Sequence, residues 1–185
     1  MKKTILDLGG GNRPHPNSTL VVDIYNAPKD KFKRQKWDLN KFPYPFKDNS
    51  FDIVFCSGVL EHLDNPVKVL EEMHRIAKKE IHVLVPHYSS HACHNHITHI
   101  NYFGAGSFDT FPEGVNADAH GSSKKWKGKL KIKLHYSNHR KWIKWVGYLV
   151  DPLINLRPVT FERYFIPLCW GGIDEIEMQF YKNDN

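Results

Sequence analysis

Three consecutive glycines, Gly9 to Gly11, follow a short apolar run that begins at Thr4, and an acid, Asp23, ends the next apolar run. Glycine lets the backbone approach a ligand closely, because it has no side chain to collide with it. A carboxylate at the tip of the second strand can accept hydrogen bonds from both hydroxyls of a nucleotide ribose. The pattern therefore predicts a site for an adenosine-containing cofactor, either a nicotinamide or flavin dinucleotide or S-adenosylmethionine.

The spacing between the glycines and the acid separates these two cofactor classes. A dinucleotide fingerprint that begins at Gly9 needs a glycine where this chain has Pro14, and it places its acid about 20 residues further on. Here Asp23 comes 14 residues after Gly9, and only eleven residues separate Gly11 from Asp23, which leaves no room for an ordinary helix. A pyrophosphate would lack the helix N-terminus that normally receives it. S-adenosyl-L-methionine carries no phosphate, so the spacing favours it.

A second group of candidate residues is a histidine-rich segment. Five of the twelve histidines fall within thirteen residues, with a cysteine among them: His87, His91, Cys93, His94, His96 and His99. Histidine and cysteine at such spacing can bind zinc or another transition metal, but no C-x-x-C pair accompanies them, and we assign no metal ligand from the sequence. The alternative is catalysis, because a neutral imidazole can accept a proton from an attacking hydroxyl, amine or carboxylic acid.

The elements that must position these residues follow from the hydrophobic pattern. Four short apolar runs, typical of buried parallel strands, cover residues 4–8, 20–22, 51–56 and 81–85. Between the last two, Asn65 can cap a helix with Pro66 at its first position. Its apolar positions fall on one face, namely Val67, Leu70, Met73 and Ile76 or Ala77. A strand, a helix and a strand form a βαβ unit, so the first half is expected to be parallel α/β.

The second half has a different pattern. Residues 87–123 form an insertion rich in His, Gly, Ser and Asn, for which we expect one short helix near residues 107–111. Leucine and isoleucine alternate with lysine over residues 130–135, which predicts a half-exposed strand, and a late strand over 173–180 is expected antiparallel beside it. Residues 142–156 are apolar enough for a helix, broken at Pro152. Because the chain contains no repeat or linker, residues 1–185 are expected to form a single domain.

Five stretches of the first half together form a recognisable pattern: Ile5–Gly11, Asp23, Asp38-Leu39, the run FPYPFKDNSFD at 42–52, and GVLEHL at 58–63. In order and spacing they resemble class I S-adenosylmethionine-dependent methyltransferases, and more narrowly the small type-11-like methyltransferase domains with an abbreviated first helix. The resemblance covers residues 4 to about 86 and continues less closely through His99 and Ser107-Phe108. It implies a Rossmann-like three-layer αβα sandwich, with a mostly parallel sheet and an antiparallel strand near the C-terminus.

The resemblance also implies roles for single residues in cofactor binding. Asp7, Gly9 and Gly11 would form the loop under the methionine part, Asp23 would hold the ribose, Asp38 and Leu39 would meet the adenine, and Ser57 and Gly58 would line the floor of the pocket. The sequence departs from the family at Asn12-Arg13-Pro14, where a third glycine and a helix are usual. Arg13 is a candidate partner for the methionine carboxylate by its charge. A second departure, Lys78-Lys79-Glu80 in place of a Gly-Gly turn, is expected to change only a turn.

Catalytic residues are expected past the predicted strands at 51–56 and 81–85. By the resemblance, Glu61 and His62 would lie near the transferring methyl group, although they could merely anchor the following helix. His99 matches a histidine of the family pattern, and His87 follows a strand at the sheet edge where open α/β sheets bind ligands. As the base that deprotonates the acceptor, we expect His99 first, then His87, then His62.

The predicted function is transfer of a methyl group from S-adenosyl-L-methionine to an oxygen, nitrogen or carboxyl nucleophile of a small molecule. The sequence Cys56-Ser57-Gly58-Val59 disfavours exocyclic-amine methylation, which uses an Asn or Asp followed by Pro-Pro and an aromatic residue, and cytosine C5 methylation, which uses a cysteine after proline. Two alternatives stay open. One is an RNA or protein methyltransferase that uses a basic lobe at residues 119–150, and the other is a non-catalytic or partner-activated protein that binds the cofactor.

The charge distribution bears on the partner. The formal net charge is +6, and residues 119–150 hold no acid but nine basic residues: Lys124, Lys125, Lys127, Lys129, Lys131, Lys133, Arg140, Lys141 and Lys144. Such a lobe attracts anions, so an anionic small molecule suits it. Trp126, Tyr136, Trp142 and Trp145 could add base stacking to a nucleic-acid platform, but alternation of lysine with apolar residues is also what a half-buried edge strand requires. We favour the edge strand over the nucleic-acid platform. We interpret residues 142–156 as a lid over the substrate rather than as a contact with a membrane surface.

Composition places further limits on the class of protein. Of 185 residues, 41% are hydrophobic and 13% aromatic, which indicates a globular chain rather than a disordered or fibrous one. No apolar run reaches the roughly 20 residues of a membrane span, and the acid and glycines of the first ten residues do not fit a signal peptide. Three scattered cysteines form no disulfide framework. We expect a soluble, cytoplasmic protein whose oligomeric state the sequence leaves open.

Overall fold

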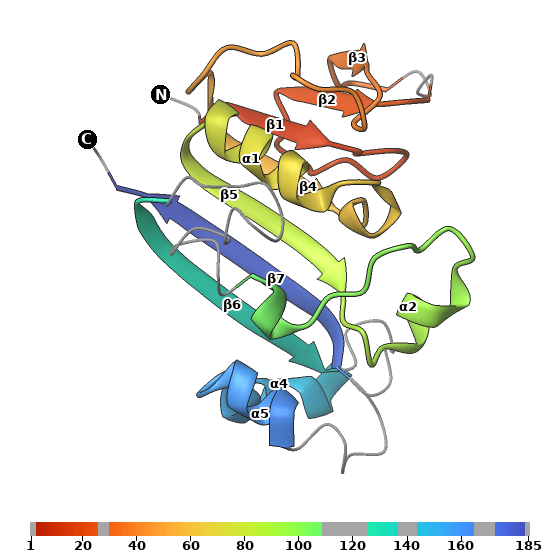
Figure 1. Cartoon of the computed structure of the whole chain (residues 1–185), viewed down its shortest axis with the longest axis vertical. Coiled ribbons are helices and arrows are strands. Elements are labelled where there is room, and N and C mark those ends of the chain that lie inside the picture. The colour runs from red at the N-terminus through yellow and green to blue at the C-terminus, as the bar shows by residue number, and fades with distance from the viewer. Residues whose placement is uncertain (1–2, 26–29, 109–125, 137–143, 165–172, 184–185) are drawn as a thin grey trace.

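The computed structural model describes residues 3–25, 30–108, 126–136, 144–164 and 173–183. Its centre is a sheet with the strand order β3–β2–β1–β4–β5–β7–β6 (Figure 1). The strands are β1 (Ile5–Leu8), β2 (Leu20–Asp23), β3 (Arg34–Lys36), β4 (Phe51–Ser57), β5 (Ala77–Pro86), β6 (Gly128–Tyr136) and β7 (Ile173–Lys182). Strands β1 to β5 are mutually parallel, and β7 runs antiparallel to both of its neighbours. The expected Rossmann-like, mostly parallel sheet with an antiparallel strand near the C-terminus is confirmed.

The central strands are short apolar runs that the sequence marks clearly. Leu6 pairs with Leu20 of β2 on one side and with Val54 of β4 on the other, and all three side chains are buried. Strand β3 was not expected, because an edge strand of arginine, glutamine and lysine has no apolar signature. The expected turn at Lys78–Glu80 is wrong: β5 begins at Ala77, immediately after the preceding helix, and includes these residues.

The helix between β4 and β5 is α1 (Pro66–Ile76), and it begins and packs as the sequence predicts. The Asn65 side chain accepts a hydrogen bond from the Lys68 amide, and Pro66 needs no donor partner at the first helical position. Val69, Leu70, Met73 and Ile76 are buried under the sheet. Burial of such side chains contributes about 1.5–3 kcal/mol each to folding, so this face of α1 is a main part of the core.

The segments after β5 are less regular. The short helix α2 (His91–Asn95) was not expected, and a 3-10 turn, η2 (Ala105–Ser107), lies close to the helix predicted near residues 107–111, of which 109–111 lie outside the described residues. Two helices, α4 (Lys144–Ile154) and α5 (Pro158–Tyr164), lie near the end of β6 (Figure 1).

The predicted break at Pro152 is wrong, because α4 continues through it to Ile154. Tertiary hydrogen bonds offset the missing amide of the proline. The Asp151 carboxylate accepts from the Tyr136 amide at 2.9 Å, and the Asn155 side chain bonds both the amide and the carbonyl of Leu134 at 2.7 and 2.8 Å. These contacts hold the last turn of α4 against the end of β6.

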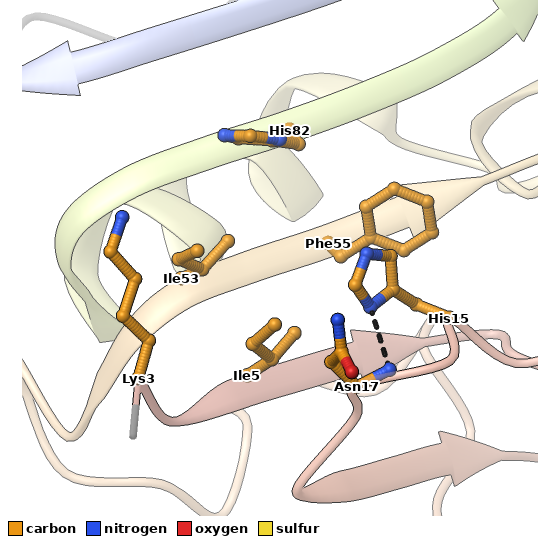
Figure 2. A pocket seen from close by; sticks show the side chains of 7 residues that line it. All are labelled: Lys3, Ile5, His15, Asn17, Ile53, Phe55 and His82. Atoms are coloured by element: carbon orange, nitrogen blue, oxygen red, sulfur yellow. Dashed lines mark hydrogen bonds between the residues drawn. The ribbon is translucent and has the colours of Figure 1, made fainter. Parts of the chain in front are cut away.

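The main core lies on one face of the sheet. Its members include Leu6, Leu8, Val54, Val83 and Met178 from the strands, together with the buried face of α1. On the opposite face, side chains of β1, β4 and β5 border a shallow hollow of about 400 Å³ (Figure 2), lined by Lys3, Ile5, His15, Asn17, Ile53, Phe55 and His82. The connection from β1 to β2 contains turns and no helix, as the spacing predicts, so only its loop residues cover this side of β1.

Candidate functional site

A cavity of about 510 Å³ opens where β1, β2 and β4 end, which is the edge where open parallel sheets bind ligands. Six of the eight predicted cofactor residues line it: Gly9, Gly11, Asp23, Asp38, Leu39 and Gly58. The residues come from four separate stretches, and parallel pairing of the strands brings these stretches together. The volume falls within the range typical of small-molecule and cofactor sites.

The glycine loop after β1 depends on the absence of side chains. Gly9 has φ +75°, and a Cβ atom built on it would lie 2.3 Å from Cγ2 of Val59. Its amide donates to the carbonyl of Val22 at 2.7 Å, which fixes the loop to the end of β2. Gly58, after β4, also has a positive φ of +65°. Glycines with positive φ therefore line the cavity after both β1 and β4, where they leave backbone accessible to a ligand.

Asp23 ends β2 with its carboxylate at the cavity wall. One oxygen accepts from the Gly11 amide at 2.9 Å and the other from the Tyr25 amide at 3.0 Å. Each carboxylate oxygen has two lone pairs, so both retain capacity for another donor. This geometry suits a diol, because two neighbouring hydroxyl groups can each donate to one oxygen.

Asp7 and Ser57 lie on the other side of the glycine loop, where they border a second hollow of about 530 Å³ together with Arg13. The Asp7 carboxylate is buried and accepts from the His15 amide at 2.7 Å and the Ser18 hydroxyl at 3.1 Å. Burial raises the pKa of Asp7, although these hydrogen bonds oppose the shift. The carboxylate therefore holds the loop between β1 and β2 in place. The resemblance had implied a position beside the methionine part of the cofactor and not this structural function.

The far end of the cavity carries a cluster of three side chains, Glu61, His62 and His99. One oxygen or nitrogen atom from each lies within 4.8 Å of the others. Glu61 and His62 belong to the 3-10 turn η1 (Leu60–His62) after β4, and His99 comes from the segment after α2. Of these residues His62 lines the cavity directly, next to Thr98. The structure thus brings together two of the three predicted bases.

Backbone hydrogen bonds join the two parts of this cluster. The carbonyl of Glu61 accepts from the amides of Ile100 and Asn101 at 2.9 and 3.1 Å. The Asn101 side chain donates to the carbonyls of Leu60 and Leu63 at 3.2 and 2.7 Å. The segment that carries His99 is therefore held on the turn that carries Glu61 and His62.

The other histidines of the predicted cluster lie apart from the cavity. His87 is fully buried, with Nδ1 bonded to the Ser89 hydroxyl at 2.8 Å and Nε2 3.7 Å from a Glu162 carboxylate oxygen. His91 is exposed beside Asn95, and His94 is exposed and bonded to a backbone carbonyl. His96 is exposed and stacks on His99, with ring centroids 5.1 Å apart. Closeness in sequence did not produce one site.

Several residues of the site were not expected from the sequence. Asn40, Val59, Leu63 and Thr98 line the cavity. Asn40 directly follows the predicted Asp38-Leu39 pair, so the motif could have indicated it. Arg34 of β3 donates to the carbonyl of Gly11 at 3.0 Å and supports the glycine loop, but no pattern in the sequence marks it.

The basic lobe is described only in part. Strand β6 is an edge strand, and its lysines alternate with residues that pack on the core, as predicted. Lys131 lies over the ring of Tyr181, and Lys133 lies 3.5 Å from a Glu177 carboxylate oxygen. Trp126 is buried and stacks on His74, so it offers no surface to a base, while the predicted Trp142 lies outside the described residues.

Comparison with known proteins agrees with this geometry. Residues 18–85 match a family model described as a methyltransferase domain. An uncharacterized protein of Methanocaldococcus jannaschii is 40% identical over 88 residues, which cover 44% of this chain and 39% of that protein. The match therefore spans about two fifths of the relative's length.

Two solved structures share the fold over nearly the whole chain. A methyltransferase dependent on S-adenosylmethionine (SAM) from Archaeoglobus fulgidus has a TM-score of 0.59 at 15% identity, covering 97% of this chain and 86% of that one. A putative methyltransferase in complex with the Haloferax volcanii Trm112 methyltransferase activator has a TM-score of 0.59 at 18% identity, covering 99% and 84%. The sheet and the cavity define a Rossmann-like methyltransferase fold. Residues 18–85 are thus similar to a methyltransferase domain, and the solved structures show that the chain shares the fold of SAM-dependent methyltransferases.

One further finding concerns membranes. Within the described part of the chain, no helix combines the length and the apolar character that crossing a bilayer requires.

Proposed function

We propose that this chain binds S-adenosylmethionine in the cavity at the strand ends and transfers its methyl group to an oxygen, nitrogen or carboxyl nucleophile of a small molecule. The observation that carries the proposal is a single cavity with the glycine loop and Asp23 at one end and His62 and Thr98 at the other. Such an arrangement can hold a cofactor and present its methyl group to an acceptor.

The cofactor end follows from the contacts of its residues. Asp23 accepts the ribose hydroxyls, and Asp38 with Leu39 borders the adenine. The backbone of Gly9 and Gly11 approaches the methionine part. Asp7 supports this loop from beneath, and Arg13, in the adjoining hollow, is the candidate partner of the methionine carboxylate.

The reaction is an in-line displacement. The bond between sulfur and the methyl carbon breaks, its electron pair stays on sulfur as a neutral thioether, and the acceptor forms the new bond to carbon. Because the leaving group needs no proton, the protein must align the reactants, exclude water and remove a proton from a neutral acceptor.

For proton removal we propose His99 first, with His62 beside it. A carbonyl oxygen accepts and cannot donate, so the bond from Nδ1 of His99 to the Cys93 carbonyl at 2.8 Å leaves Nε2 of the neutral ring as the accepting atom. His87 ranks last, because its side chain is fully buried and lies outside the cluster of Glu61, His62 and His99.

The acceptor class is inferred from the charge of the chain. The basic charge of the chain suits an anionic small molecule. Burial of Trp126 weakens the alternative of an RNA platform on the basic lobe. The Haloferax structure, which pairs a putative methyltransferase with an activator protein, supports a second candidate, namely a chain that needs a partner subunit for turnover.

Calorimetry with S-adenosylmethionine and S-adenosylhomocysteine tests the cofactor site. We expect Asp23→Asn to weaken cofactor binding by about ten- to hundredfold, since a hydrogen bond to a charged group contributes about 1.5–3 kcal/mol. The exposed Asp48, which forms an ion pair with Arg75, provides the control Asp48→Asn. Absence of binding by the wild type, or equal affinity of both variants, would refute the cofactor site.

Labelled methyl transfer into pools of small metabolites tests the activity. We expect His99→Gln to lower turnover at saturating cofactor by about 10²- to 10⁴-fold and to leave cofactor affinity unchanged. If no pool is methylated, and addition of RNA or of a candidate activator restores no product, the chain is a binding protein rather than an enzyme.

A further inference from the structure

We propose that Glu61, His62 and His99 bind a divalent transition-metal ion of the zinc type at the acceptor end of the cavity. The proposal begins with composition and distance: two imidazoles and one carboxylate offer ligand atoms that all lie within 4.8 Å of one another. Two histidines and one glutamate form a ligand set of catalytic zinc sites, in which a fourth position is open to water or substrate.

The hydrogen bonds of both histidines are those of metal ligands. Nδ1 of His62 lies 3.1 Å from the carbonyl oxygen of Thr98, and Nδ1 of His99 lies 2.8 Å from the carbonyl oxygen of Cys93. Because carbonyl oxygens only accept, each Nδ1 carries the hydrogen, and each neutral ring keeps its lone pair on Nε2. Histidines that ligate metals almost always donate their second nitrogen in this way, which fixes the tautomer and the ring orientation.

Glu61 provides the second, independent observation. Its side chain belongs to a residue that is only 3% exposed, and Oε2 has no hydrogen-bond partner within the described residues. A buried carboxylate oxygen without a hydrogen-bond partner is costly. Neutral imidazoles that already donate through Nδ1 supply no hydrogen to this oxygen. A bound cation would supply the missing partner.

The ligands also come from segments that are held together before any ion binds. The amides of Ile100 and Asn101 donate to the Glu61 carbonyl, and the Asn101 side chain bonds the carbonyls of Leu60 and Leu63. Tetrahedral zinc with bonds of about 2.0–2.1 Å separates its ligand atoms by about 3.4 Å. Zinc binding would bring the three ligand atoms, which lie within 4.8 Å of one another, toward that spacing.

The ligand chemistry selects the kind of ion. Imidazole nitrogen suits zinc and similar transition metals, whereas magnesium and calcium prefer oxygen ligands. His96 stacks on His99 and is exposed, and we assign it no bond to the ion.

The role of the ion rests on the proposed function. An ion at this position would bind an acceptor oxygen or nitrogen through its open site and lower the pKa of that group, so that its proton leaves to solvent before the methyl group is transferred. His99 then acts as a ligand rather than as a free base, because a ring nitrogen bound to metal has no lone pair left for a proton. In metal-free protein the same nitrogen can accept the proton directly.

The first experiment measures metal binding without any assay of activity. The chain is treated with a chelator, dialysed against limiting Zn²⁺ and analysed for zinc content, and the affinity is measured by competition with a chromogenic chelator. We expect one zinc ion per chain. Glu61→Gln and His99→Gln should each lower the zinc affinity at least tenfold, because mutation of residues that only hydrogen-bond to metal ligands already lowers metal affinity by about that factor. X-ray absorption should show only nitrogen and oxygen ligands, with bonds of about 2.0–2.1 Å.

The matched control is His91→Gln, an exposed histidine of the same segment that bonds only to Asn95. It should bind zinc as the wild type does. The proposal is overturned if the wild type takes up no zinc, if the ligand variants bind zinc as tightly as wild type, or if His91→Gln loses as much affinity as they do, which would indicate adventitious binding by surface histidines.

Circular dichroism and cofactor affinity separate the possible failures. Glu61 is buried, so if Glu61→Gln does not fold, the half-buried His99 and His62 variants decide. Zinc binding without S-adenosylmethionine binding would refute the proposed function and leave the metal site standing. Cofactor binding with no specific zinc binding would refute the metal site alone.

Discussion

The loop after β1 (residues 9–19) and the segment after β5 (residues 87–101) both follow parallel strands at the same edge of the sheet, yet they are built differently. The first is held by backbone and by acids close to it in sequence: the Gly9 amide bonds Val22, and Asp7 accepts from His15 and Ser18. The second gains its position by binding to η1, a turn that lies almost forty residues earlier in the chain, through Asn101 and the Glu61 carbonyl.

This difference explains which parts of the site a sequence pattern can find. The proposed cofactor end consists of glycines and carboxylates at strand ends, which a short sequence pattern can mark. The acceptor end uses side chains that become neighbours only after two distant segments pack together. A sequence pattern can therefore find the residues at the strand ends more readily than the cluster of Glu61, His62 and His99.

The largest expected effect comes from placing a side chain in the glycine loop. Gly9→Ala would put a Cβ atom 2.3 Å from Cγ2 of Val59 and would force alanine into a positive φ. We expect a loss of about 1–3 kcal/mol in the free energy of unfolding together with weaker cofactor binding. Urea unfolding followed by circular dichroism measures the first, and calorimetry measures the second.

A glycine just beyond the segment after β5 supplies the control. A Cβ atom added to Gly106, in η2, would meet no atom within 4 Å, so Gly106→Ala should change stability by no more than about 0.5 kcal/mol. Equal losses in the two variants would contradict the claim that the loop after β1 depends on bare backbone.

A smaller effect is expected where the second segment joins η1. Asn101→Ala removes two hydrogen bonds and leaves the carbonyls of Leu60 and Leu63 without their donor. We expect a loss of about 1–2 kcal/mol in stability, with faster amide hydrogen exchange at Ile100 than in the wild type. Asn95→Ala, which removes an exposed side chain that contacts only the His91 ring, should change neither quantity. Unchanged exchange at Ile100 in Asn101→Ala would show that other contacts hold the segment.

The smallest effect concerns pH and lies outside both segments. The hydrogen bond with His135 lowers the pKa of Glu177 to about 2, and the same bond raises the pKa of His135. The depressed acid pKa stabilises the fold above the unfolded value of about 4.3 and loses that contribution as pH falls toward 2. The raised histidine pKa stabilises the fold below about 6.5 and loses its contribution as pH rises through the folded pKa.

The pair therefore stabilises most between about pH 4.3 and 6.5. Glu177→Gln should flatten the dependence of the unfolding midpoint on pH across this window, while Glu71→Gln on α1 should leave its shape unchanged. If Glu177→Gln retains the wild-type curve, the edge pair contributes nothing measurable. The pH dependence of stability must be known before a pH profile of activity is assigned to His62 or His99.

Some features of the fold followed from local sequence because local physics decides them. The apolar runs of β1, β2 and β4 and the Asn65-Pro66 start of α1 need no distant partner to be recognised. Other features depend on distant contacts. Strand β3 exists because its polar residues pair with β2, and α4 continues through Pro152 because Asp151 and Asn155 bond to β6.

By itself, the sequence predicted which residues at the strand ends would line the cavity, among them Gly9, Gly11 and Asp23. The spacing of Gly9, Gly11 and Asp23 leaves no room for an ordinary helix and so disfavours a pyrophosphate, and parallel strands must bring their ends to one edge. Only the tertiary structure decided which histidines belong together, since neighbours such as His87 and His91 separated while Glu61, His62 and His99 converged. The physical reason is that strand ends are positioned by regular backbone pairing, whereas loop side chains are positioned by hydrogen bonds to segments far away in the chain.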